Sequence, residues 1–451
     1  MIQNRSELLS HGSINGRRSV LEIIEHALKS SDPYRATKKA VKFNDRELII
    51  DGYRIDIQKK RNLYVIGAGK ATYPIAKALE EILEDRITRG LIVVKRGQKE
   101  ELKKIKKIEA GHPIPDVQGF QAAQEIMTIA DEAKKDDLVF AIITGGSSAL
   151  LPYPAEGISL EDLGNVNELL LFSGATIQEI NAVRKHISQI KGGRLALRIQ
   201  PAEIVNLTVS DVIGDWNMID FITDNTVPDR STFKDAITTL RKYNLLKHVP
   251  RSVRNHLRKA DPNLETPKTF ERITSRTWIL MTNKETCEAA VHKAQTLGFE
   301  AQILSTMIEG ESREAGIVHG GIAREIEAHH RPIKCPGVLI SGGETTVRIS
   351  GNQGRGGPNQ EFILGFATKI SGSARIVGAA VDTDGTDGLT DAAGGIADGL
   401  TMRRVKDLDL DVYESLQNHD SNSLLQMLGD TIMTGPTGTN VMNLRVLLVS
   451  R

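Results

Sequence analysis

The stretch LYVIGAGKAT at residues 63–72 indicates the fold, because an apolar run leads directly into a glycine turn and a helix-type sequence. A strand, turn and helix in this order point free N–H groups and the positive end of the helix at an anion. Gly67 and Gly69 permit close approach of the backbone to a ligand, and Lys70 lies within the turn. The sequence therefore predicts an anion-binding loop here, and we favour a functional Lys70 over a surface lysine.

Strand-like and helical patterns alternate on either side of this stretch. The apolar runs LIVVKRG (91–97) and LVFAIITGG (138–146) follow it, separated by helical patterns near residues 74–85 and 119–134. Before it, an amphipathic helix is expected, with Ser19 and Glu22 forming its capping box. This alternation is typical of βαβ units around a parallel sheet, so we expect an α/β fold.

The chain is expected to form two α/β domains. The segment DPNLETP (261–267), with two prolines and several turn formers, is the predicted boundary. Residues 1–260 are predicted to form a Rossmann-like parallel sheet with flanking helices. Residues 261–451 are predicted to form a glycine-rich α/β domain, with strands from TWILMTN (277–283) to LRVLLVS (444–450). An alternative for the last strand is that it packs back on the first domain.

Composition favours a small-molecule partner. The 451 residues carry a net charge of +1, so no charge imbalance points to nucleic acid or to an anionic membrane. The lysine-rich stretch from Lys95 to Lys107 is interrupted by glutamates and lacks aromatic residues, so we interpret it as a solvated face. No apolar run resembles a signal peptide or approaches the roughly 18 residues of a membrane helix, so a cytoplasmic location is expected.

A second glycine loop, TGGSSALL (144–151), ends another apolar strand. Its two glycines allow a ligand to approach the backbone, and its two serines can cap a helix or donate to a phosphate. Helix capping alone explains one of these serines. We favour a ligand loop in which Gly145, Gly146, Ser147 and Ser148 bind a nucleotide or phosphate.

Residues 178–198 predict a helix that is interrupted at Gly192 and Gly193. Arg184, Lys185 and Lys191 lie toward its end, where cations also suit the negative end of a helix dipole. A binding role and this dipole role are about equally supported, and Lys191 is carried forward as a phosphate-binding candidate. His186 is predicted to be a helix-face or core residue, since no paired acid or ligand spacing accompanies it.

Three glycine-framed loops crowd the segment from Ser341 to Gly388: SGGETTV (341–347), GRGGPNQE (354–361) and DTDGTDG (382–388). Their recurrence after apolar strands indicates a single site. Arg355, between glycines, suits a bidentate contact with phosphate or carboxylate. Carboxylate oxygens suit Mg²⁺, although the acids of SDVIGDW (210–216) are equally compatible with a simple turn. The predicted phosphate-binding residues are Gly342, Gly343 and Asn359, and the predicted metal ligands are Asp211, Glu344, Asp384 and Asp387.

Together, these motifs resemble those of the class II glycerate 2-kinases. The resemblance covers nearly the whole chain and lies in GAGKA (67–71), GHPIPD (111–116), GGSSALL (145–151), INAVRKHISQIKGGRLA (180–196), SGGETTV, GRGG (354–357), NQEF (359–362), DTDGTDG, TDAAGG (390–395) and TGPTGTNV (434–441). It implies a large N-terminal domain, a C-terminal glycine-rich domain and an active site in the cleft between them. The implied reaction is ATP-dependent phosphorylation of D-glycerate at its 2-hydroxyl with Mg²⁺ or another divalent metal, by a monomer or homodimer.

By position, Lys70 and Arg355 match the family's active-site lysine and arginine. In that reaction Lys70 would neutralise the transferring phosphoryl group, and Arg355 would bind the acid's carboxylate or the moving phosphate. A strong general base is not required for phosphoryl transfer through a loose transition state. Asp211 and Asp384 are the candidates for this role.

The chain departs from the family's pattern at Pro358, where an arginine is usual, and at Asp224 within TDNTVPD (223–229). Both changes make the site less cationic, so another short hydroxy (sugar) acid is an alternative substrate. An NAD(P)-dependent hydroxypyruvate reductase is disfavoured, because Thr72 and Lys95 stand where a dinucleotide fingerprint requires glycine and an acid. A nucleotide-binding regulator without transfer activity is a further alternative.

Overall fold

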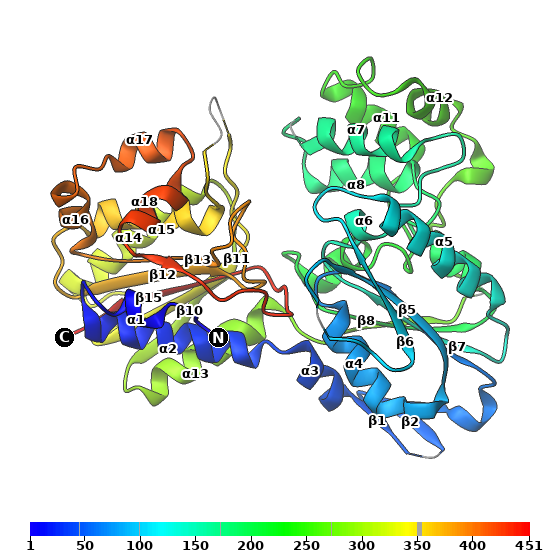
Figure 1. Ribbon diagram of the computed structural model, residues 1–451, viewed down its shortest axis with the longest axis horizontal. Helices are drawn as coiled ribbons and strands as arrows, with labels where there is room; N and C mark the ends of the chain where they lie inside the picture. The colour runs from blue at the N-terminus through cyan, green and yellow to red at the C-terminus, as the bar shows by residue number, and fades with distance from the viewer. Residues whose placement is uncertain (45, 99, 172, 272, 350–353) are drawn as a thin grey trace. The chain divides into compact units, whose positions relative to one another are not determined.

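The computed structural model describes residues 1–451 except 45, 99, 172, 272 and 350–353. The chain divides into two compact units, each visible in Figure 1. The parallel-sheet unit comprises Pro33–Ser210 and Asp215–Leu280. The mixed-sheet unit comprises Met1–Asp32, Asp211–Gly214 and Met281–Arg451.

Six parallel strands form the main sheet of the parallel-sheet unit, in the order β6-β5-β4-β7-β8-β9. Numbered along the chain within this sheet, the order is 3-2-1-4-5-6, which is that of dinucleotide-binding sheets. The order reverses between β4 and β7, and ligands of such sheets bind beyond the carboxyl ends of the strands at this switch point. The bounds are β4 (Leu63–Ala68), β5 (Ile87–Lys95), β6 (Ile105–Ala110), β7 (Leu138–Ile143), β8 (Glu203–Thr208) and β9 (Ser275–Ile279).

Burial on both faces explains why β4 and β7 are continuous apolar runs. Every residue of the two strands is buried. The helices α5 (Val117–Glu132) and α9 (Arg194–Ile199) share a hydrophobic core with one face of the sheet. The helix α4 (Thr72–Leu83) packs against β5 and β7, on the opposite face because right-handed crossovers in opposite directions place helices on both sides. The predicted Rossmann-like sheet is confirmed.

Four helices of this unit enclose a small core of their own: α7 (Leu160–Leu171), α8 (Ile177–His186), α11 (Phe233–Lys242) and α12 (Arg251–Lys259). Figure 1 shows them grouped beyond the parallel sheet. Capping boxes start α8, at Thr176 and Glu179, and α11, at Thr232 and Asp235. The other elements are α3 (Pro33–Ala40), α6 (Ser147–Leu150), α10 (Ile219–Ile222) and a small antiparallel sheet of β1 (Val41–Phe43), β2 (Glu47–Ile50) and β3 (Tyr53–Asp56).

The mixed-sheet unit contains six strands in the order β10-β11-β15-β12-β13-β14. Only β10 and β11 are a parallel pair among these described strands; every other neighbouring pair is antiparallel. Because β15 runs against both β11 and β12, Asn443 at its start pairs with Gly343 and with Asp382 at the ends of its neighbours. The loops that follow β11 and β12 therefore begin at one edge of the sheet. The bounds are β10 (Glu300–Ile308), β11 (Gly337–Gly343), β12 (Ile376–Asp382), β13 (Gly394–Asp398), β14 (Thr431–Ile432) and β15 (Asn443–Val449).

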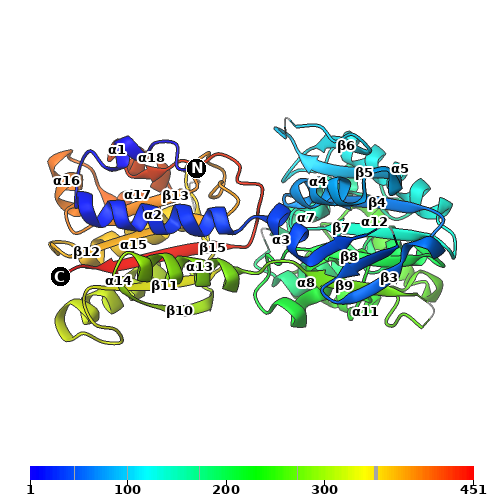
Figure 2. The same ribbon diagram turned by 90° about the horizontal axis from the view of Figure 1, so that it is seen from below.

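Helices cover both faces of the mixed sheet. On one face, α2 (Ile14–Ser30) and α13 (Asn283–Thr296) pack against the central strands, and Figure 2 shows α2 lying along the sheet. On the other face lie α14 (Ser312–His329) and α15 (Pro358–Ile370). The remaining helices are α1 (Arg5–Leu8), α16 (Thr401–Asp407), α17 (Val412–Gln417) and α18 (Ser421–Met427). No helix in the described part of the chain is long and apolar enough to cross a membrane.

The structure corrects the predicted division of the chain at residue 260. The strand β9 is an edge strand of the parallel sheet, although TWILMTN was assigned to the second domain. The helix α2 packs on the mixed sheet, although residues 1–260 were assigned to the first domain. The alternative that the last strand packs on the first domain is wrong, because β15 lies at the centre of the mixed sheet.

One local prediction fails and another is confirmed. The helix α2 begins at Ile14, before the predicted capping box, and the Ser19 hydroxyl donates to the carbonyl of Asn15 within the helix. Most described residues of the lysine-rich stretch from Lys95 to Lys107 are exposed, as predicted, and its last residues begin β6, which is buried at both ends and partly exposed between them. Charged side chains on an edge strand hide its strand character from a sequence pattern.

Arg17 fastens α2 to the mixed sheet through buried ion pairs. Its Nε donates to Oδ2 of Asp398 at 2.5 Å, and its Nη1 donates to Oδ1 of Asp430 at 2.7 Å. All three side chains are buried. Burial by itself lowers the pKa of Arg17, but Asp430 and Asp398 outweigh it and raise the pKa above its ordinary value. These pairs explain why the start of the chain belongs to the mixed-sheet unit.

We expect the substitution Arg17→Ala to lower the free energy of unfolding of the mixed-sheet unit by about 3–5 kcal/mol, because it leaves the buried Asp398 without its cation and leaves Asp430 paired with Arg404 alone among the arginines. Hydrogen exchange of peptides from α2, β13 and β15 measures this loss. Arg18→Ala, at the exposed neighbouring position, is the matched control. Equal protection of the mixed sheet in the two variants would contradict the assignment of α2 to this unit.

Candidate active site

The loops after β4 and β7 bond to each other at the switch point of the parallel sheet. The Lys70 N–H donates to the carbonyl of Gly145 at 2.8 Å, and the Ala71 N–H donates to Oγ1 of Thr144 at 3.2 Å. Gly69 has φ +142°, and a Cβ built there would lie 2.0 Å from Oγ1 of Thr144. No other residue therefore fits at position 69 without moving the second loop. The two predicted anion loops form one structure.

Gly67 and Gly146 also have steric reasons to be glycine. A Cβ at Gly67 would lie 2.4 Å from the carbonyl oxygen of Ile142. Gly146 has φ +86°, and a Cβ there would lie 3.1 Å from Nε2 of His112 and 3.3 Å from Cγ of Lys70. The side chains of Lys70 and His112 therefore converge on the second loop. The sequence reasoning missed His112, although the GHPIPD motif (111–116) contains it.

The two serines of the second loop have different surroundings. Ser147 is buried at the start of α6, which has four residues, and its N–H donates to the carbonyl of Thr144. Ser148 is half-buried, and its Oγ accepts a hydrogen bond from Nζ of Lys191 at 2.8 Å. Because α6 is so short, its dipole adds little, and the side chains and glycine backbone must supply any affinity for an anion.

Lys191 is a buried cation beside this loop. Its Nζ lies 3.1 Å from Oδ2 of Asp224, and both side chains are 8% exposed. Burial lowers the pKa of Lys191, and the charge of Asp224 opposes that change. The carbonyl of Asp224 accepts the N–H of Gly193 at 2.7 Å, so the TDNTVPD segment packs directly on the interrupted helix. Asp224, identified as a departure from the family, neutralises Lys191 in this structure.

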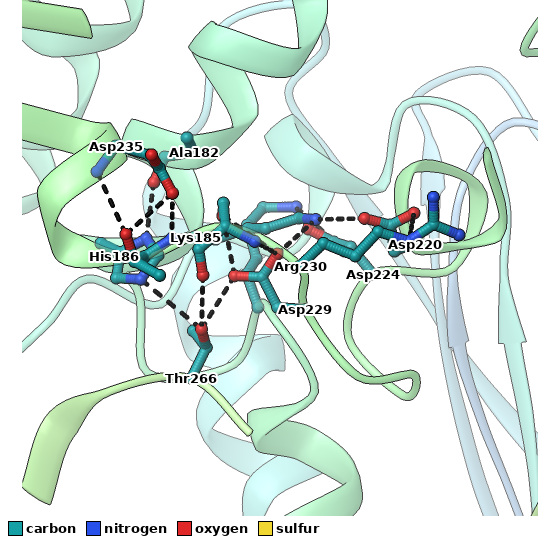
Figure 3. Close-up of polar contacts among 12 residues, drawn as sticks. Ala182, Lys185, His186, Asp220, Asp224, Asp229, Arg230, Asp235 and Thr266 are labelled. Atoms are coloured by element: carbon teal, nitrogen blue, oxygen red, sulfur yellow. Dashed lines mark hydrogen bonds and ion pairs between the residues drawn. The ribbon is translucent and has the colours of Figure 1, made fainter. Parts of the chain in front are cut away.

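Lys185 belongs to a buried polar network that fixes the same region (Figure 3). Its Nζ lies 3.0 Å from Oδ1 of Asp229 and 3.4 Å from Oδ2 of Asp220. The Thr266 hydroxyl donates to Oδ2 of Asp229 at 2.9 Å. Burial by itself raises the pKa of Asp229, but Lys185 and these hydrogen bonds hold it below its ordinary value. Lys185 is therefore a structural cation, and its charge is compensated.

His186 is a core residue, as predicted. It is fully buried at the end of α8, and its Nδ1 lies 2.7 Å from the carbonyl oxygen of Ala182. Its Nε2 lies 2.7 Å from Oε1 of Glu265. Phe233 packs edge-on against the ring, with the ring centroids 4.7 Å apart. These contacts join α8, α11 and the segment after α12.

In the mixed-sheet unit, a buried arginine supports the SGGETTV loop. Arg445 of β15 is fully buried; its Nη1 donates to the carbonyl of Gly342 at 3.1 Å and its Nη2 to Oγ1 of Thr345 at 2.8 Å. Burial lowers the pKa of Arg445 to about 10. Gly342 and Gly343 are closely packed, since a Cβ would lie 1.6 Å from Oδ1 of Asn283 at the first and 2.4 Å from the backbone of Ile308 at the second. The loop therefore has a fixed backbone with a cation behind it.

His319 supports the same loop as a neutral imidazole. Its Nδ1 lies 2.7 Å from the carbonyl oxygen of Ala315, so Nδ1 carries the proton. Its Nε2 then accepts the hydroxyl of Ser341 at 3.0 Å. Burial lowers the pKa of His319 to about 4, and the charge of Arg445 acts in the same direction.

The backbone around Arg355 is clamped, and its side chain is exposed. A Cβ at Gly354 would lie 2.6 Å from Asp420, and one at Gly356 would lie 2.3 Å from Oγ of Ser421. The Arg355 N–H donates to Oδ1 of Asp420 at 3.1 Å. Packing of the flanking glycines against the start of α18 therefore directs the Arg355 guanidinium outward, where it is available to a ligand.

Asp387 caps the N-terminus of α15. Its Oδ1 accepts the N–H of Asn359 at 3.0 Å, and its Oδ2 accepts the N–H of Gln360 at 2.9 Å. Both amide side chains donate to the same carboxylate. Burial raises the pKa of Asp387, and these bonds to its charged form oppose that change. Asp387, a predicted metal ligand, and Asn359, a predicted phosphate-binding residue, hydrogen-bond to each other, and Pro358 fits the first position of this helix.

The other three predicted metal ligands, Asp384, Asp211 and Glu344, have different surroundings. Asp384 accepts both the N–H and the hydroxyl of Thr386 at 2.8 Å, forming a turn. Asp211 accepts the side chain of Asn440 at 3.1 Å, and the Asp384 carbonyl accepts the N–H of Thr437 at 3.2 Å, so both acids contact the TGPTGTN loop (434–440). Glu344 is exposed. The described residues contain no group of three or more His, Cys, Asp or Glu that could hold a metal ion by itself, so which of the four candidate carboxylates contact a metal stays a prediction.

Comparison with known proteins identifies the class to which this fold and these loops belong. The family model described as a domain of unknown function (DUF4147) matches residues 19–258, and that of the MOFRL family matches residues 337–443. The glycerate 2-kinase of Pyrococcus horikoshii is 45% identical over 431 residues, which cover 95% of this chain and 96% of the relative. The D-glycerate 2-kinase of Thermotoga maritima is 37% identical and covers 96% of this chain and 98% of the relative.

A solved structure of glycerate kinase from Thermotoga maritima aligns with a TM-score of 0.80 at 36% identity, covering 96% of this chain and 99% of that chain. A protein of Agrobacterium vitis whose name assigns it to the hydroxypyruvate reductases is 36% identical, covering 98% of this chain and 96% of the relative. The chain is an α/β enzyme with a kinase-type set of glycine loops. It belongs to the glycerate 2-kinase family.

The neutral state of His319 makes stability depend on pH. Its pKa of about 4 in the folded protein lies below the unfolded value near 6.5, so its contribution is complete above pH 6.5 and is lost as pH falls toward 4. We expect this loss to amount to about 3 kcal/mol. His319→Gln should flatten the dependence over that interval, measured by urea unfolding with circular dichroism. His329→Gln, at the exposed end of the same helix, is the control; matching profiles for the two variants would refute the neutral role of His319.

Proposed function

We propose that this protein transfers the γ-phosphoryl group of ATP to the 2-hydroxyl of D-glycerate, yielding 2-phosphoglycerate and ADP. The observation that carries the proposal is the near-complete coverage of relatives named glycerate 2-kinase, at 45% and 37% identity. The closely bonded loops at the switch point of the parallel sheet support it, because phosphoryl transfer needs positioned N–H donors and cations.

Lys70 is proposed to stabilise the charge that develops on the transferring phosphoryl group. Its backbone is fixed by the bond to Gly145, and its side chain passes beside Gly146. Fixed cations act more strongly than mobile ones because they need no reorganisation during the reaction. Arg355 is proposed to supply a second cation, from a backbone that is fixed by its flanking glycines.

Mg²⁺ is proposed to enter with ATP. Mg²⁺ in kinase sites is usually held by one or two carboxylates together with phosphate oxygens and water. Asp211 and Asp384 fit this pattern, because both contact the TGPTGTN loop. When bound, the ion would neutralise phosphate charge. One of these two aspartates is also proposed to orient the acceptor hydroxyl; Glu344 is the remaining candidate for an exposed metal contact.

The hydroxypyruvate reductase alternative is favoured by two observations, the strand order of the parallel sheet and the name of the Agrobacterium vitis relative. Against it, Thr72 packs its hydroxyl against Ile142 and Thr144 where a dinucleotide loop has its third glycine. Lys95 ends β5, where an acid would bind the ribose. We therefore place this activity second to the kinase.

Substrate breadth is the other alternative. Asp224 removes net positive charge beside Lys191, so a kinase of another short hydroxy acid remains a distinct proposal. The cellular context that we propose is cytoplasmic, with small molecules and no nucleic acid as partners, and with the protein acting as a monomer or homodimer.

The proposed activity predicts ADP release that depends on D-glycerate and Mg²⁺. A coupled assay for ADP, run with D-glycerate, glycolate, D-lactate and tartronate, should give the highest kcat/KM with D-glycerate. The same preparation should not oxidise NADH or NADPH with hydroxypyruvate. Turnover with another acid in preference to D-glycerate would replace the proposed substrate, and nicotinamide oxidation would replace the reaction.

We expect Lys70→Ala to lower kcat by roughly 10³-fold or more, as the loss of a charge-stabilising group in a transition state does. Arg355→Ala should lower kcat/KM by a comparable order. Lys77→Ala, on the exposed side of α4, and Arg331→Ala, beyond α14, are the matched controls and should retain activity. Circular dichroism establishes that the variants fold; unchanged kinetics in Lys70→Ala would remove Lys70 from the mechanism.

A further inference from the structure

A small pocket in the parallel-sheet unit contains a cation that none of the roles above uses. The pocket lies beside Ser148, Arg184, Ser188 and Lys191, and its remaining wall consists of Leu151, Pro152, Tyr153, Leu163 and Asn167. Ser148 comes from the loop after β7, and Arg184 comes from α8. The pocket therefore lies between the switch-point loop and the group of helices α7, α8, α11 and α12.

Arg184 is held in place by one end of its guanidinium. Its Nε donates to Oδ1 of Asn167 on α7 at 2.9 Å. Within the described ranges, neither Nη1 nor Nη2 of Arg184 has a hydrogen-bond acceptor in the protein. Arg184 is half-buried, and its two terminal nitrogens present the parallel donors that a carboxylate matches.

The charges around the pocket leave one positive charge uncompensated. Lys191 is paired with Asp224 at 3.1 Å. The neighbouring Lys185 is paired with Asp229 and Asp220. Arg184 has no carboxylate within ion-pair distance in the described part of the chain, and the charge of Asp224 only opposes the lowering of the pKa of Arg184 by burial. A net charge of one favours a monoanion over the multiply charged phosphates of ATP.

The remaining wall of the pocket combines polar and apolar groups. The Lys191 Nζ and the Ser148 Oγ lie 2.8 Å from each other. Leu151, Leu163 and Pro152 are apolar residues of the same lining. The free space in the pocket is about that of one water molecule, so it fits the carboxylate end of an acid and not the whole molecule.

We propose that Arg184 binds the carboxylate of the acid substrate through its two terminal nitrogens, with Ser148 and Lys191 beside it. This inference rests on the proposed function for the identity of the acid. It assigns substrate recognition to a residue of the parallel-sheet unit, and it leaves Arg355 to the phosphoryl group. The competing explanation is that Arg184 only ties α8 to α7 through Asn167.

The test compares an acid with its neutral analogue. Glycerol has the same hydroxyl at its second carbon and lacks the carboxylate. In Arg184→Gln we expect KM for D-glycerate to rise roughly tenfold to a hundredfold, as for the loss of a charged hydrogen bond. KM for ATP, and any turnover of glycerol at high concentration, should change less than about twofold, because neither involves a carboxylate at Arg184. Arg184→Lys keeps the charge, so its KM for D-glycerate should lie between those of the wild type and Arg184→Gln.

Two controls separate recognition from structure. Arg198→Gln removes an exposed arginine of α9 that pairs with Asp131, and it should leave every constant unchanged. Asn167→Ala removes the tie between α7 and α8; if Arg184 is only structural, this variant and Arg184→Gln should lower the melting temperature alike and raise KM for glycerol as much as for D-glycerate. That result would overturn the proposal.

A binding measurement keeps the inference distinct from the proposed function. Calorimetric titration of the full chain with D-glycerate and with glycolate, in the absence of ATP, should show binding to the wild type and at least tenfold weaker binding to Arg184→Gln. If the wild type binds these acids but transfers no phosphate, the proposed function fails and the carboxylate site stands. If both proteins bind equally, or neither binds, the carboxylate site is refuted.

Discussion

The close approach of two loops at the switch point of the parallel sheet is the constraint on which the candidate site depends. Gly69 lies so near Thr144 that a single added carbon would be 2.0 Å from its hydroxyl oxygen. This contact, with the bond from Lys70 to Gly145, fixes the direction in which Lys70 leaves the backbone. A change of strand order produces the opening between the loops, and the glycines let the two backbones meet there. The strand order that defines the fold therefore also positions the loops of the candidate site.

Most glycines of the candidate loops are explained by packing before any ligand is considered. Gly342 faces Asn283, Gly357 faces Asp387, and Gly356 faces Ser421, each too closely for a side chain. Glycine in these loops therefore builds a rigid backbone, and the charged side chains beside it supply the chemistry. A substitution at such a glycine would disturb folding and activity together, so it would say little about catalysis.

The buried cations differ in how far neighbouring carboxylates neutralise them. Lys185 is fully compensated by two aspartates, Lys191 by one, and Arg445 by neutral acceptors alone. A cation that is paired with a carboxylate has a structural role, because its charge is neutralised. A cation without a carboxylate partner keeps a positive potential that attracts an anionic ligand. The positive potential of Arg445 lies behind the SGGETTV loop, and that of Arg184 lies beside the small pocket.

The sequence predicted those strands and turns whose residues show a clear local pattern. The strands β4 and β7 are continuous apolar runs, and the glycine turns after them mark their ends. The membership of α2 and β9 was missed because it depends on tertiary contacts, such as those of Arg17, that no local pattern encodes. For the same reason the bond of Asp387 to α15, 28 residues away along the chain, could not be seen. Arg445 was hidden inside an apolar strand pattern, and Arg184 was identified as a cation but not as one with free donors.

We infer that the switch-point loops and the neighbouring Arg184 pocket bind the substrates. This inference can be tested by hydrogen exchange of the whole protein, measured with and without ATP, Mg²⁺ and D-glycerate. We expect slower exchange in peptides covering residues 67–72, 144–151 and 184–193, and no change in the small sheet of β1 to β3. Unchanged exchange in those three peptides, with protection elsewhere in the chain, would contradict it.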